Sequence, residues 1–292
     1  MPSILRRLMP LVLLLCVATG ALSLGFLLAN RRPLRPTAKL LEVTVLNVGQ
    51  GEATLIRTPN GQIILLGAGP PETAEAVAKA LTQAGVKQID LLILPYPYAE
   101  AIGGVSEVFA QFPVKMALET GSDGVNEWQQ KARQLLRESR VSVRLVRAGD
   151  ELTMDGVRIE ILAPANPLLT AEPVAANNSL VVAVRYGSTR FLWMGGIERA
   201  GEVALLSRTP DLRANWLRVS RFGTRLASSP ELLRQVSPEY IVVSVGQNRS
   251  GLPHVETLKR LNATGATVVR TDVGNAPNLR FLSDGLHVTQ EP

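Results

Sequence analysis

The feature that most constrains the fold is the way short apolar runs are joined along the chain. The first three runs are separated by the tight-turn signals GQG (49–51) and PNG (59–61), which are typical of antiparallel hairpins. Later runs alternate with helix-like stretches such as residues 71–85. Hairpins followed by strand–helix alternation predict two sheets with helices packed outside them. We therefore predict one α/β domain over residues 41–292.

A charge-free apolar run over residues 9–28 precedes this domain and is about long enough to span a bilayer. A cleaved signal peptide is the alternative, but the run is long for one and no small-x-small cleavage site follows it. We predict a transmembrane anchor or signal segment over residues 1–30 and a basic, proline-containing linker over residues 31–40. The short basic N-terminus favours a single-pass membrane protein with an extracytoplasmic domain, although the basic linker argues for the opposite orientation.

Charge is distributed unevenly between the two parts of the chain. The whole chain has 31 basic and 25 acidic residues, and the first 40 residues hold six of the basic and none of the acidic ones, which leaves 25 of each for the domain. A net-neutral domain in a chain with 4% aromatic residues is not typical of a dedicated nucleic-acid binder. One cysteine and two histidines exclude an intrachain disulfide and a cysteine-based zinc site.

Six stretches carry glycines within apolar frames in a distinctive order. They are NVGQGEATLIRTPNG, ILLGAG, LLILPYPYAEAIGG, NNSLVVAVRYGSTRFLWMGGIE, RVSRFGTRLASSPELL and YIVVSVGQNRSGLPHVETLKRL. Together they resemble the metallo-β-lactamase fold, and in particular the C-terminal hydrolase-like domain of ComEC-type competence DNA-uptake proteins. The resemblance implies a four-layer αββα sandwich with its site at one edge.

The metal ligands that the resemblance would imply are largely replaced in this chain. The family pattern has a Ser-His-Pro-Asp-x-Asp-His-x-Gly-Gly loop, a Thr-Gly-Asp, a His-His-Gly-Ser, a His-Pro-His and an Ile-Asp-Ala-Gly. The matching stretches here are PYPYAEAIGG (95–104), MGG (194–196), RFGT (221–224), LPH (252–254) and LGAG (66–69).

These replacements predict that the chain has no metal cofactor and no catalytic residue of the family type. Two hydrolytic metals need several imidazole and carboxylate donors in one shell. Ala101, Gly196 and Phe222 donate none, and Arg221 places a fixed positive charge there. We expect a degenerate binding cleft instead. Its candidate residues are Glu52, Tyr96, Tyr98, Glu100, Arg221, Arg225 and His254.

The roles of these cleft residues remain open at the level of sequence. Glu100 and Arg221 are expected to pair and neutralise the former metal pocket, and the alternative is an acid/base pair in a metal-free cleft. Tyr96 and Tyr98 either stack on a ligand ring or plug the emptied cavity, with their hydroxyls in water.

Three functions are compatible with this reading, and we favour the first. It is a membrane-anchored, catalytically degenerate binding or scaffolding module with an unknown protein partner. The second is a non-cutting DNA-binding protein related to DNA uptake, which the neutral domain disfavours. The third is a metal-independent hydrolase that uses His254 with Glu52 or Glu100, which the lack of a positioned nucleophile disfavours. The second function would use an arginine patch made of Arg213, Arg218, Arg221 and Arg225.

Overall fold

The computed structural model describes residues 39–121, 126–273 and 278–291. The chain divides into two units, Met1–Lys39 and Leu40–Pro292, and the second is the predicted domain. The predicted anchor over residues 1–30 and nearly all of the predicted linker lie outside the described residues. No helix in the described ranges has the length and apolar character needed to cross a membrane.

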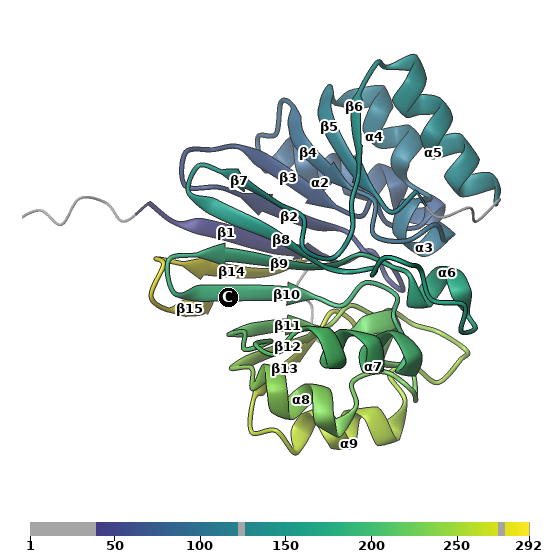
Figure 1. Cartoon of the computed structure of the whole chain (residues 1–292). Coiled ribbons are helices and arrows are strands. Elements are labelled where there is room, and N and C mark those ends of the chain that lie inside the picture. Colours follow the sequence, from purple (N-terminus) through teal and green to yellow (C-terminus); the bar gives the residue numbers. More distant parts are fainter. Residues whose placement is uncertain (1–38, 122–125, 274–277, 292) are drawn as a thin grey trace, which may run out of the picture. The chain divides into compact units, whose positions relative to one another are not determined.

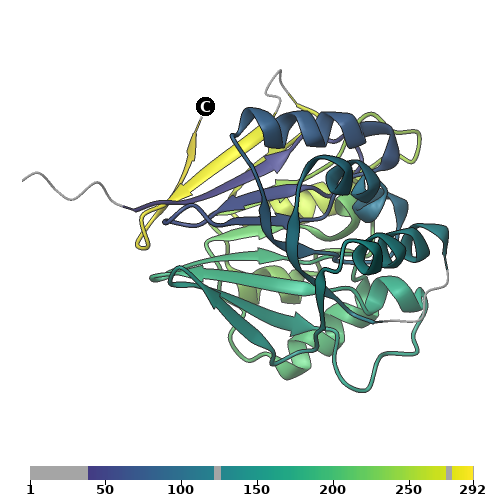
Figure 2. The ribbon, with the colours of Figure 1, turned by 90° about the horizontal axis from the view of Figure 1, so that it is seen from above.

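Two sheets form the middle of the second unit, and helices cover their outer faces (Figures 1 and 2). Among the described residues, the first sheet has the strand order β15-β14-β1-β2-β3-β4-β5-β6, and the second has the order β13-β12-β11-β10-β9-β8-β7. The strands of the first sheet are β1 (Leu41–Leu46), β2 (Thr54–Arg57), β3 (Ile63–Leu66), β4 (Ile89–Ile93), β5 (Val114–Glu119), β6 (Ser142–Leu145), β14 (Asn278–Ser283) and β15 (Val288–Glu291). The strands of the second are β7 (Glu151–Met154), β8 (Val157–Ala163), β9 (Val181–Tyr186), β10 (Thr189–Trp193), β11 (Trp216–Arg218), β12 (Tyr240–Val243) and β13 (Thr267–Arg270).

The helices divide between the two outer faces in chain order. Those beside the first sheet are η1 (Pro71–Thr73), α2 (Ala74–Gln83), α3 (Ala99–Ile102), α4 (Val105–Gln111) and α5 (Glu127–Glu138). Those beside the second are α6 (Val174–Asn177), α7 (Arg199–Arg208), η2 (Ser220–Gly223), α8 (Pro230–Val236) and α9 (Val255–Asn262). Each sheet therefore has helices on one face and the other sheet on the opposite face.

Three apolar cores separate these four layers in the described part of the chain. Side chains alternate between the two faces of each strand, so neighbouring residues belong to different cores. In β3, Ile63 and Leu65 face the helices, whereas Ile64 and Leu66 face the second sheet. Because both faces are buried, such a strand reads as a continuous apolar run rather than as an alternating one. The core between the sheets also holds the tryptophans of β10 and β11, with ring centroids 4.8 Å apart. The predicted α/β sandwich is thus confirmed.

Each sheet begins with antiparallel strands and continues with parallel ones. The predicted hairpins are confirmed, since β1–β2 and β2–β3 pair antiparallel. From β3 to β6 and from β10 to β13 the pairing is parallel. Loops that follow parallel strands leave from the same edge of a sheet, which is where open α/β sheets place their sites. The sequence pattern did not reveal α3, α6, β7, β15 and η2, whose four residues each are too few for a clear period. It also did not reveal the six-residue strand β5.

Candidate functional site

The candidate site lies where loops after parallel strands of both sheets meet. The loop after β4 contacts the segments that flank β9 and β10, since Leu180 donates its backbone N–H to the carbonyl of Pro95 at 2.8 Å. A Cβ on Gly196 would lie 2.9 Å from Ser179 Oγ and 3.3 Å from the ring of Tyr96, so glycine lets these groups approach closely. The structure therefore brings the stretches 95–104 and 194–196 together, as the resemblance implies.

A buried ion pair between Glu52 and Arg218 forms the centre of this site. Arg218 ends β11 and Glu52 lies between β1 and β2, and their side chains are 1% and 0% exposed. Arg218 Nη1 lies 3.2 Å from Glu52 Oε2, and the guanidinium also donates to the carbonyls of Val219 and Gly51. Neither Glu52 oxygen accepts a hydrogen bond of good geometry from the described residues. The carboxylate is therefore held mainly by the charge of Arg218.

Burial and neighbouring charges act on Glu52 in opposite directions. Burial raises the pKa of the Glu52 carboxyl above its ordinary value, and the Arg218 guanidinium and the Tyr96 hydroxyl oppose this change. Glu100 adds to the increase, and its backbone carbonyl accepts the Glu52 N–H at 2.9 Å. The structure thus joins Glu52, Tyr96 and Glu100, three of the predicted cleft residues.

Tyr96 plugs the space beside this pair. The residue is 2% exposed, and its ring meets that of half-buried Tyr98 edge-on, with centroids 5.9 Å apart. Its hydroxyl was expected in water but is buried without a hydrogen-bond partner of good geometry in the described part of the chain. Burial raises the pKa of Tyr96 well above its usual value, and the charge of Glu52 adds to this. A phenolate, the only form in which tyrosine binds a metal well, is therefore disfavoured.

Arg221 does not form the ion pair that the sequence suggested. Its guanidinium lies 3.5 Å from the Glu198 carboxylate and 5.6 Å from the centroid of the Tyr98 ring. The predicted ion pair between Arg221 and Glu100 is therefore wrong. Arg221 and the following Phe222 have φ angles of 39° and 60°, in the left-handed region that favours glycine. Contacts made elsewhere must hold this strained turn in place.

The remaining predicted residues, His254 and Arg225, both contact Glu256 in the first turn of α9 and do not complete an acid/base pair. His254 is the N-cap of α9, and its Nδ1 accepts the Glu256 N–H at 3.3 Å. Arg225 is exposed and lies 3.4 Å from the same glutamate. Within the described residues, no hydrogen bond or ion pair joins His254 to Glu52 or Glu100.

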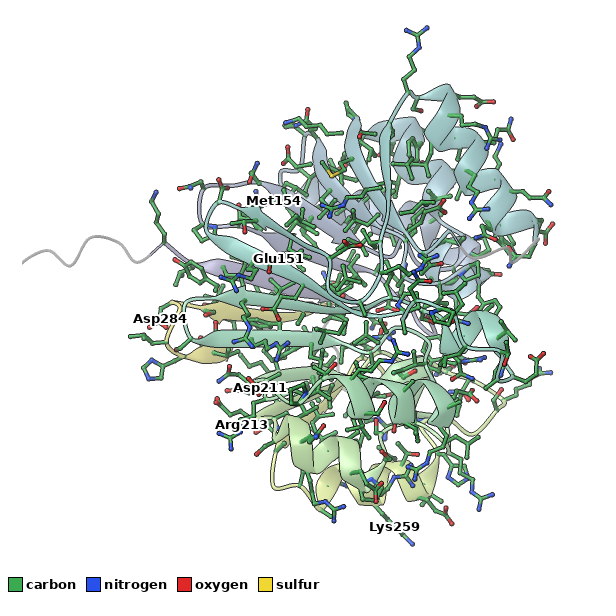
Figure 3. The ribbon with its side chains drawn as sticks, viewed as in Figure 1. Glu151, Met154, Asp211, Arg213, Lys259 and Asp284 are labelled. Carbon is green, nitrogen blue, oxygen red and sulfur yellow. The ribbon has the colours of Figure 1, made fainter. Side chains whose placement is uncertain are left out.

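The predicted arginine patch is divided by the fold. Arg218 is buried in the ion pair, and sequence reasoning misplaced it because a charged residue at a strand end usually faces water. Arg213 precedes β11, whereas Arg221 and Arg225 follow it. Figure 3 shows Arg213 beside Asp211, on the side of the molecule opposite to α3 and α6. The sequence did contain a signal for burial, because Arg218 directly follows the apolar residues Trp216 and Leu217 in β11.

The residues present do not fit a two-metal centre. No group of three or more histidine, cysteine, aspartate or glutamate side chains converges in the described part of the chain. Glu52, the buried carboxylate at the centre, already has Arg218 as its counter-ion. We therefore assign no chemical step to a metal here.

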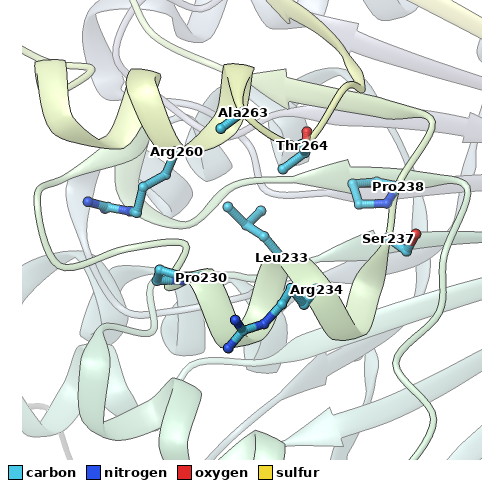
Figure 4. Close-up of a pocket in the computed structure, with 8 residues that line it drawn as sticks. All are labelled: Pro230, Leu233, Arg234, Ser237, Pro238, Arg260, Ala263 and Thr264. Carbon is cyan, nitrogen blue, oxygen red and sulfur yellow. The ribbon is translucent and has the colours of Figure 1, made fainter.

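A groove between α8 and α9 lies apart from these residues. Leu233 points into it from α8, and Arg234 and Arg260 flank it (Figure 4). Its volume is about 510 Å³. The Arg260 guanidinium already donates to the backbone carbonyls of Arg225, Ala227 and Ser228, which makes it a structural clamp.

Comparison with known proteins gives three similar sequences, and no family model matches the chain. The chain is 26% identical over 259 residues to ComE operon protein 3 of Bacillus subtilis, covering 82% of this chain and 33% of that protein. It is 27% identical over 255 residues to Recombination protein 2 of Haemophilus influenzae, covering 85% and 30%. It is 28% identical over 287 residues to Competence protein ComA of Neisseria gonorrhoeae, covering 91% and 38%. The chain therefore spans about a third of the length of these proteins.

Solved structures with the same arrangement are also found. The metallo-β-lactamase fold protein YhfI of Bacillus subtilis matches with a TM-score of 0.57 and 12% identity, covering 84% of this chain and 100% of that one. Zinc-bound PqqB of Methylobacterium extorquens matches with a TM-score of 0.54 and 12% identity, covering 79% and 97%. The resemblance that the sequence motifs predicted is confirmed.

Proposed function

We propose that this chain, which has the metallo-β-lactamase fold and is similar to competence proteins, is a metal-free binding or scaffolding module. The observation that carries the proposal is the buried Glu52–Arg218 pair. A guanidinium at the centre of the site supplies the positive charge that a metal ion would bring, but it offers no open coordination position and cannot lower the pKa of a bound water. The site thus keeps its electrostatic balance without hydrolytic chemistry.

We also propose that the module is attached to a membrane. The support is the charge-free run over residues 9–28, with its basic flanks. The domain would then lie outside the cytoplasm and act on a protein partner of the DNA-uptake process. The names of two similar proteins, which refer to the ComE operon and to competence, support that setting.

Metal content tests the proposal directly. We expect the full-length chain, expressed with zinc and manganese supplied, to contain well under about a tenth of an equivalent of either metal, because the donor set is incomplete. Elemental analysis of the purified protein measures this, and Glu52→Ala serves as a matched control for adventitious metal. One or two equivalents in the wild type and none in Glu52→Ala would contradict the proposal and reopen hydrolysis.

DNA binding is the second candidate function, and the same preparation tests it. The names of the similar proteins, which refer to competence and recombination, favour it. The split of the arginine patch and the ion pair of Arg225 disfavour it. We expect no salt-sensitive binding of a labelled DNA duplex. Binding through phosphate contacts would weaken steeply as the salt concentration rises. Salt-sensitive binding that is lost in Arg221→Glu and Arg225→Glu would replace the scaffold role with DNA binding.

A further inference from the structure

One edge of the first sheet is open in a way that the other edges are not. The edge strands are β15 and β6 in the first sheet and β13 and β7 in the second. In the described part of the chain, only β6 among them carries large exposed apolar side chains, Val143 at 41% and Leu145 at 59%. All four residues of β6 are exposed, and the strand lies beside α5 (Figure 1). Natural sheets usually protect such an edge from pairing with another chain.

The same two residues direct their backbone groups toward this edge. Val146 donates its N–H to the Glu119 carbonyl at 3.0 Å, so that residue is turned toward β5. Backbone groups alternate in direction along a strand. The N–H and C=O groups of Val143 and Leu145 therefore point away from β5, toward the open edge. An added strand would find both hydrogen-bonding groups and apolar side chains there.

Positive charge is concentrated in the segment that contains this edge strand. Residues 131–147 contain six basic residues and one acidic residue, although the domain as a whole is neutral. Lys131, Arg137 and Arg140 are exposed and form no ion pair within the described ranges. The surplus of positive charge favours an occupant that carries carboxylates.

Two other occupants fit this edge less well. A second copy paired through β6 would bring the basic residues of both copies close together, where like charges destabilise strand pairing. A nucleic acid would make no use of the apolar side chains or of the backbone groups of Val143 and Leu145. An extended polypeptide uses both, since strand addition takes affinity from main-chain bonds and specificity from alternate side chains.

We propose that β6 binds an acidic, extended polypeptide segment that adds to the first sheet as a further strand. Its alternate apolar side chains pack on Val143 and Leu145, and its carboxylates lie near Lys131, Arg137 and Arg140. This proposal gives the chemical class of the partner for the scaffold role. It rests on the proposed function only in assuming that the module has a partner. The surface is separate from the Glu52–Arg218 site, so the metal measurement and the peptide measurement can fail independently.

Fluorescence anisotropy of a labelled peptide tests this proposal on the full-length chain. The probe is Glu-Asp-Val-Thr-Val-Thr-Asp-Glu, and the matched peptide has lysine in place of each acidic residue. We expect saturable binding of the acidic probe and at least about tenfold weaker binding of the lysine peptide. Val143→Pro removes an outward N–H without touching the bonds to β5, and should weaken binding about tenfold. Leu145→Ser removes the apolar side chain without a change of charge and should do the same.

Controls separate this result from unfolding and from other occupants. Val203→Ser removes an apolar side chain in the same way at a valine of α7 that is 52% exposed, and should leave the affinity unchanged. Circular dichroism of each variant reports whether the fold is kept. Equal affinity for both peptides, or unchanged affinity in both β6 variants, overturns the proposal. Concentration-dependent dimerisation that Leu145→Ser abolishes overturns the proposal in favour of a second copy. Displacement of the peptide by a DNA duplex overturns it in favour of nucleic acid.

Discussion

Replacing Arg218 with methionine is expected to lower the free energy of unfolding by about 3–5 kcal/mol, because it leaves a buried carboxylate without its counter-ion. The Glu52 side chain is fully buried and has no well-formed hydrogen bond in the described residues to compensate. Methionine has a similar volume and flexibility, so the lost charge rather than a cavity dominates the change. Urea unfolding followed by the fluorescence of the buried tryptophans measures the difference.

The double variant with Glu52→Gln and Arg218→Met should recover a large part of this loss. With both charges removed, the cost of burying an unpaired ion disappears. Arg225→Met is the matched control, because its pair with Glu256 is exposed and such pairs contribute about 0–1 kcal/mol. An Arg218→Met variant as stable as this control contradicts the central role of the pair. So does a double variant whose loss of unfolding free energy equals the sum of the losses of the two single variants.

The buried Glu52 carboxyl also makes the free energy of unfolding depend on pH. Because burial raises its pKa, the folded protein binds more protons than the unfolded chain in the interval above the ordinary value of 4.5. The contribution of this carboxyl is fully present below that value and is lost as the pH rises through the raised pKa. We expect Glu52→Gln to flatten the plot of unfolding free energy against pH over this interval. An unchanged slope contradicts the assignment.

Replacing Gly104 with alanine is expected to cost about 3–5 kcal/mol or to prevent folding, because the backbone leaves no room for a side chain. A Cβ at this position would lie 2.1 Å from the carbonyl oxygen of Ala68, in the loop after β3. Gly104 has a φ of −79°, which alanine also adopts, so the expected effect is steric and not conformational. The urea midpoint and the yield of soluble protein measure it.

Gly85 provides the converse control. Its φ is +74°, but a Cβ there would have nothing within 4 Å. Gly85→Ala should therefore cost about 1 kcal/mol from the left-handed backbone alone. A Gly104→Ala variant that loses no more than Gly85→Ala would show that the loop after β4 can move away from Ala68.

Packing alone accounts for glycines at this site. Gly103 also has no free space, since a Cβ there would lie 2.3 Å from Pro71 Cδ. Close backbone approach at the site is required by packing, whether or not a metal is bound. Ala101 and Phe222 are buried at the same site, where their apolar side chains add to the packing.

The sequence by itself determined the architecture and the types of side chain present at the site. Turn signals such as PNG (59–61) act over a few residues, and continuous apolar runs such as β3 report burial on both faces. The absence of donors at positions such as Ala101 is likewise a property of side-chain chemistry, which needs no coordinates. Local chemistry of this kind can be read directly from the chain.

Only the tertiary structure decided which charged groups meet. Arg218 was grouped with surface arginines, but the packing of β11 against the loop before β2 buries it beside Glu52. The partner of Arg221 and the buried hydroxyl of Tyr96 were misplaced for the same reason. Ion pairs and burial depend on residues far apart in the chain, and their energies depend on desolvation that is set only once the two sheets have packed together.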